Sequence, residues 1–182
     1  KTIAVAKGGT GNEIRLVGVV ALYDKPRPDS PKLISKLKTL GVSVKMLTGD
    51  ALPIAKEIAD QVGLGRNIDT IADLKQATGE EALRIAEESD GFAEVYPEDK
   101  HLVVRNLQDR RHVVGMTGDG VNDAPALKQA EVGIATSNAA DVAKKAASVV
   151  LTSEGLEGIV ELVMVGRRIY QRIITWILNK IV

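Results

Sequence analysis

Residues 113–128 read VVGMTGDGVNDAPALK: an apolar run, a short turn with two glycines and two aspartates, and then a helical pattern. An earlier stretch, VKMLTGDA at residues 44–51, repeats the plan of an apolar strand, Thr-Gly-Asp and a helix. In open α/β sheets, ligands bind beyond the carboxyl ends of the strands, where both Thr-Gly-Asp turns would lie. The two stretches therefore predict a sheet edge that carries polar chemistry.

Outward from these stretches, apolar strands alternate with amphipathic helices. Residues 16–22 (LVGVVAL) form a continuous apolar run, as expected for a strand buried on both faces. Asp29, Ser30 and Pro31 are typical of a helix start, and Gly41 of its end. Further strands are expected at 42–47, 92–95, 112–116, 132–135 and 148–151, further helices at about 51–62, 79–89, from 97, 123–130, 139–146 and from 155, and an irregular polar region at 64–78. The alternation predicts an α/β fold with a mostly parallel, Rossmann-type sheet and helices on both faces.

Three carboxylates are expected at the ligand-binding edge of this sheet. Asp50, Asp119 and Asp123 would converge there, and clustered carboxylates repel one another unless a cation intervenes. Mg²⁺ is the natural partner, because it takes one or two carboxylates together with waters and phosphate oxygens. Gly118 and Gly120 would let the backbone approach a ligand closely. The sequence therefore predicts a magnesium site at the loop after the strand.

Hydrogen-bond donors accompany the carboxylates. Thr48 supplies a hydroxyl and Asn122 an amide, while the helix that follows Asn122 offers free backbone N–H groups to an anion. Lys100, early in the helix after Tyr-Pro-Glu-Asp, could neutralise a phosphoryl oxygen. The combined set is typical of a site that holds Mg²⁺ and a phosphoryl group.

Each of these signals also has a purely structural interpretation. Taken alone, the turn at 48–50 is an ordinary helix cap and Lys100 an ordinary surface lysine. The loop 117–123 carries more carboxylates and amides than capping requires, which favours a functional role. His101 and His112 lack ligand partners at useful spacing and are interpreted as structural.

Composition excludes several other classes of function. The 182 residues include 24 Lys and Arg and 24 Asp and Glu, so net charge indicates no affinity for nucleic acids or for membranes in general. Cysteine is absent, which excludes disulfides and thiolate metal sites. Near the end, residues 166–182 turn from basic to apolar, and Tyr170 and Trp176 resemble the interfacial flank of a membrane helix. An amphipathic helix that packs on the core is the alternative.

Three segments resemble the phosphorylation domain of P-type ATPases, in the same order and at compatible spacing: MLTGD (46–50), YPEDK (96–100) and GMTGDGVNDAPALK (115–128). DKPR (24–27) is similar to the family's Asp-Pro-Pro-Arg segment, with Lys25 in place of a proline. Residues 90–100 and 149–172 are most similar to the plasma-membrane proton-pumping branch. The resemblance covers the chain from about residue 16 onward.

The resemblance implies a haloacid dehalogenase-like fold and a cycle in which an aspartate takes the γ-phosphoryl group of ATP and the aspartyl phosphate is hydrolysed, driving cation transport, here of H⁺. It implies Mg²⁺ and ATP as cofactors. By motif match, Asp119 would bind Mg²⁺ with support from Asp123, and Thr48, Lys100 and Asn122 would contact the phosphoryl group. Gly49 and Asp50 would lie beside the nucleotide phosphates. Asp24 and Arg27 would belong to the hinge-side segment that contributes to nucleotide binding.

The chain departs from the family pattern at one point, because it contains no Asp-Lys-Thr-Gly-Thr segment with the nucleophile. We therefore expect an isolated chain without activity: an exit segment from a nucleotide-binding domain (1–15), the C-terminal part of the phosphorylation domain (16–165), and the start of a membrane-entering or amphipathic helix (166–182). Its expected partners are the nucleotide-binding, actuator and transmembrane domains of the same pump. The expected location is the cytoplasmic side of a membrane, the plasma membrane in the proton-pumping branch.

Two other functions stay open at this point. A soluble phosphatase of the dehalogenase type would need its own Asp-x-Asp nucleophile segment near the N-terminus, and none is present. A non-catalytic module that binds Mg²⁺ and phosphate would keep the binding groups without the nucleophile.

Overall fold

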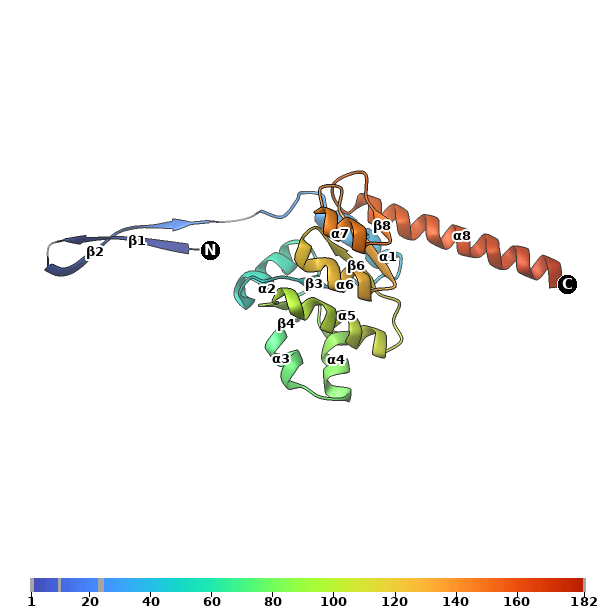
Figure 1. The fold of residues 1–182 in the computed structure, drawn as a ribbon, viewed down its shortest axis with the longest axis horizontal. Coiled ribbons are helices and arrows are strands. Elements are labelled where there is room, and N and C mark those ends of the chain that lie inside the picture. Colours follow the sequence, from blue (N-terminus) through green and yellow to red (C-terminus); the bar gives the residue numbers. More distant parts are fainter. Residues whose placement is uncertain (1, 10, 23–24, 182) are drawn as a thin grey trace.

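The computed structural model describes residues 2–9, 11–22 and 25–181. An α/β body stands between a long antiparallel hairpin on its N-terminal side and a long helix on its C-terminal side (Figure 1). The C-terminal half of α8 reaches one extreme of the molecule and the far end of the hairpin the other, and β1 runs back from there toward the body. No helix in the described ranges combines the length and the apolar character that are needed to cross a bilayer.

The body contains short strands and helices in regular alternation. The strands are β3 (Met46–Leu47), β4 (Ile68–Thr70), β5 (Gly91–Ala93), β6 (Gly115–Gly118), β7 (Val132–Ala135) and β8 (Val149–Val150). The helices are α1 (Ser30–Thr39), α2 (Leu52–Gln61), α3 (Ile71–Gln76), α4 (Glu80–Glu88), α5 (Lys100–Asp109), α6 (Ala124–Gln129), α7 (Asp141–Ala146) and α8 (Glu157–Ile181), with 3₁₀ turns η1 (Pro97–Asp99) and η2 (Val121–Asp123). This order confirms the α/β class.

All strand pairs in the body are parallel, and they form two three-stranded sheets with the orders β3-β5-β4 and β6-β7-β8. Among the described strands, β3 and β6 each have one neighbour and so stand at a sheet edge. Leu47 of β3 packs against the apolar cluster that contains Met116 of β6, so both edge strands adjoin one interior.

Helices cover both faces of the first sheet, as predicted. Ala93 of β5 is buried in a cluster with Ala55 and Ala59 of α2, whereas its neighbour Phe92 is buried in a cluster with Leu74 of α3 and Val103 of α5. Successive residues of a strand point to opposite faces, so the two clusters lie on opposite sides of β5. The large share of Ala and Val explains how the short elements pack closely with so few aromatic residues.

The prediction that residues 16–22 form a buried strand is wrong. They belong largely to β2 (Gly11–Ala21), which pairs antiparallel with β1 (Thr2–Gly9) and touches no other strand in the described structure. Leu16, Val17 and Val19 are therefore exposed. A continuous apolar run requires cover on both faces, and the described residues do not provide that cover.

The prediction of an irregular region at 64–78 is also wrong. Strand β4 and helix α3 lie within it, and both are too short to produce a periodic signal over the usual window. A capping box defines the start of α3: Asp73 N–H donates to Thr70 Oγ1, and Thr70 N–H donates to Asp73 Oδ2.

Helix α8 projects away from the body over its C-terminal half. Val160, in its first turns, is the buried residue of this helix, and Ile169, Ile173 and Trp176 are exposed. The alternative of an amphipathic helix packed on the core is therefore not what the structure shows. The proposed domain limits at 15 and 165 stay predictions.

Candidate functional site

The loop after β3 is closed by the side chain of Thr48. Its hydroxyl accepts a hydrogen bond from the backbone N–H of Asp50 (3.1 Å) and donates to the Asp50 carboxylate (3.3 Å). The Thr48 N–H continues the sheet by donating to the carbonyl of Phe92 (3.0 Å). Gly49 lies between them, and a side chain built there would stand 3.5 Å from the carbonyl oxygen of Val95. The Thr-Gly-Asp turn is therefore a defined loop at the carboxyl end of β3.

The loop after β6 is organised by Asp123. Its Oδ2 atom accepts hydrogen bonds from the backbone N–H groups of Asp119 and Gly120, each at 3.1 Å. Gly118 is required for this arrangement, because an added Cβ would lie 2.5 Å from the Cβ of Asp123. Ala140 N–H fixes the other side of the loop by donating to the Asp119 carbonyl (2.8 Å). The backbone around Asp119 is thus held from two directions.

Lys100 reaches this loop from α5. Its Nζ donates to Asp123 Oδ1 at 2.5 Å, with 24% of the lysine side chain and 6% of the aspartate side chain exposed. Burial raises the pKa of the Asp123 carboxyl, but the Lys100 ammonium and the two loop amides outweigh burial and hold that pKa below its usual value. The Asp123 carboxyl therefore stays ionised at neutral pH, and its contact with Lys100 places the lysine Nζ at the loop.

A third segment, residues 94–100, connects the two loops, and we call it the connecting segment. Glu94 N–H donates to the Asp50 carbonyl and Val95 N–H to the Thr48 carbonyl, each at 3.0 Å. At its other end the segment carries Lys100. Glu94 has a positive φ of 57°, a backbone conformation that non-glycine residues adopt at a cost of roughly 1 kcal/mol or more. Sequence reasoning did not identify this backbone role of Glu94 and Val95, and no residue-type signal could have revealed it.

The remaining predicted residues take different positions. Asn122 lies exposed in η2, within the loop organised by Asp123. Arg27 pairs with Glu154 ahead of α8 (2.9 Å), and both side chains are more than half exposed. Asp24 lies outside the described residues. The structure thus brings Lys100 and Asp123 into contact and groups them with Asp119 and Asn122, while Arg27 binds elsewhere.

The convergence of Asp50, Asp119 and Asp123 on one metal ion is not found. Within the described part of the chain, no group of three His, Cys, Asp or Glu side chains is placed to hold a metal. The Asp50 carboxylate is instead bonded within its own turn by Thr48. Mg²⁺ needs only one or two protein carboxylates and prefers oxygen ligands, so Asp119, supported by Asp123, still fits this ion.

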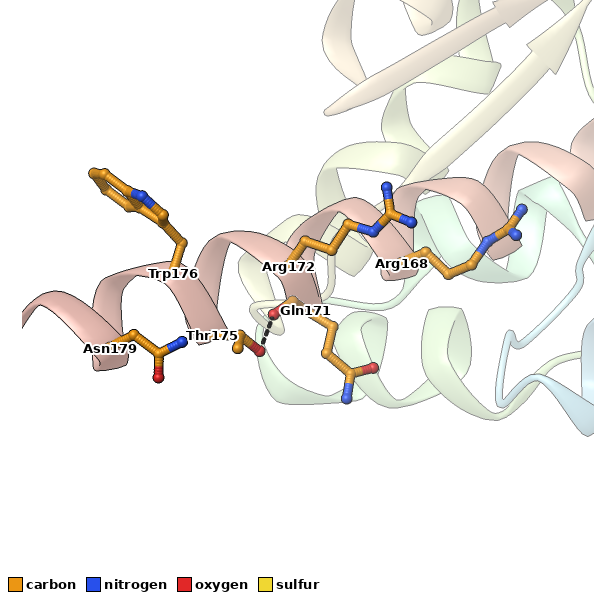
Figure 2. A pocket seen from close by; sticks show the side chains of 6 residues that line it. All are labelled: Arg168, Gln171, Arg172, Thr175, Trp176 and Asn179. Atoms are coloured by element: carbon orange, nitrogen blue, oxygen red, sulfur yellow. Dashed lines mark hydrogen bonds between the residues drawn. The ribbon is translucent and has the colours of Figure 1, made fainter.

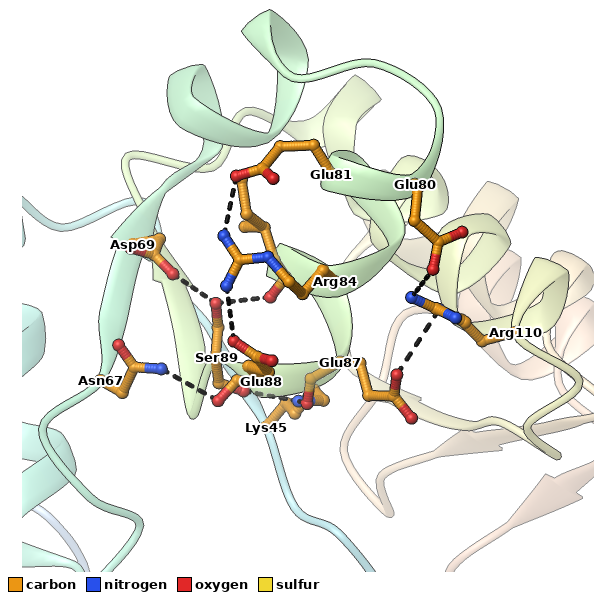
Figure 3. A network of polar contacts seen from close by, with 11 residues as sticks. Lys45, Asn67, Asp69, Glu80, Glu81, Arg84, Glu87, Glu88, Ser89 and Arg110 are labelled. Atoms are coloured by element: carbon orange, nitrogen blue, oxygen red, sulfur yellow. Dashed lines mark hydrogen bonds and ion pairs between the residues drawn. The ribbon is translucent and has the colours of Figure 1, made fainter.

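A second polar network lies away from this edge, around the amino ends of β3 and β5 (Figure 3). Buried Ser89 donates to Asp69 and to the Ile85 carbonyl, and Lys45 donates to the Glu87 and Ser89 carbonyls. Burial lowers the pKa of Lys45, against the opposing charges of Asp90 and Glu87. Most of these contacts satisfy backbone carbonyls, which indicates a structural role.

A shallow hollow on α8 also lacks the features of a catalytic site. It is lined by six side chains of this one helix (Figure 2): Arg168, Gln171, Arg172, Thr175, Trp176 and Asn179. Thr175 Oγ1 donates back to the Gln171 carbonyl at 2.9 Å. A surface formed by one helix cannot enclose a phosphoryl group, so the loops at the sheet edge remain the candidate site.

Similarity to known proteins identifies the family of this chain. The family of haloacid dehalogenase-like hydrolases matches residues 2–131. The chain is 46% identical over 185 residues to a protein named as a cation-transporting ATPase of Methanocaldococcus jannaschii, covering 98% of this chain and 23% of that protein. It is 47% identical over 169 residues to one named as a plasma membrane ATPase of Dictyostelium discoideum, covering 90% of this chain and 16% of that one. The chain thus spans less than a quarter of these relatives.

Solved structures agree. A zinc-transporting PIB-type ATPase in the E2.Pi state is 33% identical with a TM-score of 0.68, over 88% of this chain and 22% of that one. The catalytic domain of the CPx-ATPase CopB-B is 25% identical with a TM-score of 0.59, over 89% and 57%. From the matching family, the α/β fold and these relatives we conclude that the chain belongs to the haloacid dehalogenase-like hydrolases and that its relatives are P-type cation-transporting ATPases.

Proposed function

We propose that this chain is the C-terminal part of the phosphorylation domain of a P-type cation pump, where it binds Mg²⁺ and the phosphoryl group of an aspartyl phosphate. The observation that carries the proposal is the Lys100–Asp123 ion pair, which joins the connecting segment after β5 to the loop at the carboxyl end of β6. This edge is where α/β sheets bind ligands.

The charge of each site residue determines whether it would bind the phosphoryl group or the metal ion. Lys100 would neutralise a phosphoryl oxygen, and Thr48 and Asn122 would donate hydrogen bonds to others. Asp123 orients the backbone of Asp119 through its two amide contacts, and Asp119 would hold the metal ion. Bound Mg²⁺ would supply neutralisation of the charge on the phosphoryl oxygens.

The nucleophile must come from outside the 182 residues, since no Asp-Lys-Thr-Gly-Thr segment occurs among them. In the parent pump the aspartate of that segment would attack the γ-phosphorus of ATP, the bond from this phosphorus to the bridging β-phosphate oxygen would break, and ADP would leave. Water would later hydrolyse the aspartyl phosphate and release phosphate. The adjoining edges of β3 and β6, each with one described neighbour, would accept a further parallel strand between them. A strand there would deliver a carboxylate to the loops at its carboxyl end.

The first test replaces one carboxylate in the parent pump. Asp119→Asn should abolish or severely slow the formation of phosphoenzyme from ATP, measured as acid-stable ³²P incorporation after a rapid quench. Asp109→Asn, which alters an exposed carboxylate at the end of α5, is the matched control and should label normally. Normal labelling of Asp119→Asn would refute the assignment.

For the transported ion we propose H⁺. Residues 90–100 and 149–172 resemble the proton-pumping branch, and one relative is named as a plasma membrane ATPase. The plasma membrane is the corresponding location. ATP-dependent proton uptake into vesicles that carry the parent protein would support the proposal, whereas zinc uptake without a proton gradient would replace H⁺ with the cargo of the structural relative.

By itself the chain should act as a module that binds without turnover. Binding groups that lack a nucleophile cannot form a covalent intermediate. Incubation of the isolated chain with labelled ATP and Mg²⁺ should give no acid-stable ³²P, and stoichiometric labelling would mean that another residue is the nucleophile.

A further inference from the structure

Asp99 is a buried carboxylate directly before Lys100. Its side chain is 5% exposed, and its Oδ1 atom forms an ion pair with Lys75 at 2.7 Å. The second oxygen, Oδ2, has no hydrogen-bond partner within the described residues. A buried carboxylate with one partner depends strongly on that partner, because losing it leaves an uncompensated charge. Lys75 is therefore the contact that keeps Asp99 in this place.

Lys75 reaches Asp99 from a well-anchored helix. It lies in the last turn of α3, whose start is fixed by the Thr70–Asp73 capping box. Its neighbour Leu74 is 2% exposed and packs in a cluster with Val95 and Val103, which flank η1 on both sides. The backbone of Lys75 is thus held against the same core as the connecting segment, although 46% of its side chain is exposed.

Asp99 occupies the point where the connecting segment turns into α5. Its N–H donates to the Tyr96 carbonyl (2.9 Å) to form η1, and the next residue, Lys100, begins α5 and binds Asp123. The other end of the segment is fixed by Glu94 and Val95. Lys75 thus provides the side-chain contact at the end that carries the lysine.

We propose that Lys75 and Asp99 are positioning residues for Lys100: their ion pair holds η1 against α3 and so directs the Lys100 ammonium toward the phosphoryl site. The inference rests on the proposed function, since it assigns to Lys75 an effect on phosphoryl transfer. It makes α3, which contributes nothing to the site directly, a support for the catalytic lysine.

A purely structural ion pair would behave differently. It would add stability to the body, and its removal would change the reaction independently of Lys100. A positioning pair acts through Lys100, so its effect must disappear once the Lys100 ammonium has been removed.

The test is a double-mutant cycle in the parent pump, read as the rate of phosphoenzyme formation at saturating ATP. Lys75→Met should slow this rate by about 10- to 100-fold, the scale expected for a misplaced catalytic group, with little change in the ATP concentration for half-maximal labelling. Lys100→Met should slow it more, and the double variant should be no slower than Lys100→Met. Lys75→Arg should restore most of the rate. Arg66→Met removes an exposed ion pair with Asp60 as a matched control and should label like the wild type.

Independent, multiplying effects of Lys75→Met and Lys100→Met would overturn the proposal, as would a wild-type rate for Lys75→Met. If Lys75→Met does not fold, Asp99→Asn replaces it in the cycle and carries the same expectation, because it removes the charge and keeps the shape. Normal labelling of Asp119→Asn would instead reject the proposed function itself. If Asp119→Asn loses labelling but the effects of Lys75→Met and Lys100→Met multiply, the positioning role is rejected and the proposed function stands.

Discussion

At the scale of single residues, the site depends on Asp123 more than its sequence position suggests. One oxygen binds Lys100, 23 positions earlier, and the other accepts the two amides of its own loop. A carboxylate with four possible lone-pair sites can serve both purposes. The residue types at 119 and 123 indicate metal chemistry, but the sequence alone does not reveal that Asp123 shapes the loop that presents Asp119.

Gly118 tests this role of Asp123. Gly118→Ala would place a Cβ 2.5 Å from the Asp123 Cβ and 2.7 Å from its Cγ, so Asp123 must move. We expect a loss of about 1–3 kcal/mol of stability from overpacking, with slower phosphoenzyme formation in the parent pump. Gly115→Ala in the same strand is the control, because its nearest contact would be 3.9 Å away. Equal behaviour of the two variants in denaturation and labelling would contradict this account.

At the scale of elements, the sequence predicts where helices begin and end better than it predicts strands. Pro31 and Gly41 bracket α1 as expected, with Gly41 at a φ of 69°. Strand β6 begins at Gly115 although the apolar run suggests 112, because Arg111 adopts a positive φ and His112 N–H donates to the Leu107 carbonyl, extending the turn after α5. Such a shift depends on tertiary contacts, which local propensity does not contain.

Glu131 joins two of these elements and should make their stability depend on pH. Its carboxylate accepts hydrogen bonds from Val114 N–H ahead of β6 (2.9 Å) and from Gln108 of α5 (2.7 Å), and the backbone contact lowers its pKa most. A lowered pKa contributes stability that is fully present above the ordinary value of 4.5 and is lost as the pH falls through the folded-state value.

The corresponding measurement compares wild type with Glu131→Gln in urea unfolding at a series of pH values. The wild type should be the more stable protein above the ordinary glutamate pKa, and the difference should shrink as the solution is acidified. A difference that is independent of pH, or one that grows in acid, would contradict the assigned contacts.

At the scale of the whole molecule, two extensions project from the body, and both carry exposed apolar side chains. The hairpin exposes Ile14, Leu16 and Val17, and α8 exposes Ile173 and Trp176. The alternation of strands and helices correctly predicts the α/β fold of the body. The prediction of a buried strand at 16–22 fails, because a strand buried on both faces needs neighbours that the described chain does not supply. The structure brings two of the predicted site residues, Lys100 and Asp123, into contact, and their ligand roles stay predictions.

Removal of residues 166–182 should have little effect on the body. Val160, before the cut, is the buried residue of α8, and the residues at 166–181 are exposed. The truncated chain should melt within a few degrees of the full chain, since surface changes alter stability by about 0.5 kcal/mol or less, and it should be more soluble. A large fall in melting temperature, measured by circular dichroism, would show that this segment packs on the body.

The most direct test of the account is the Mg²⁺ dependence of phosphoenzyme formation by the parent pump, compared between the wild type and Asp119→Glu. The longer side chain keeps the charge but displaces the carboxylate that would bind the ion. Half-maximal labelling of Asp119→Glu should require at least about tenfold more Mg²⁺, because even changes beyond the direct ligands lower metal affinity by this factor. The ATP requirement should change little. Superimposable Mg²⁺ curves would contradict it.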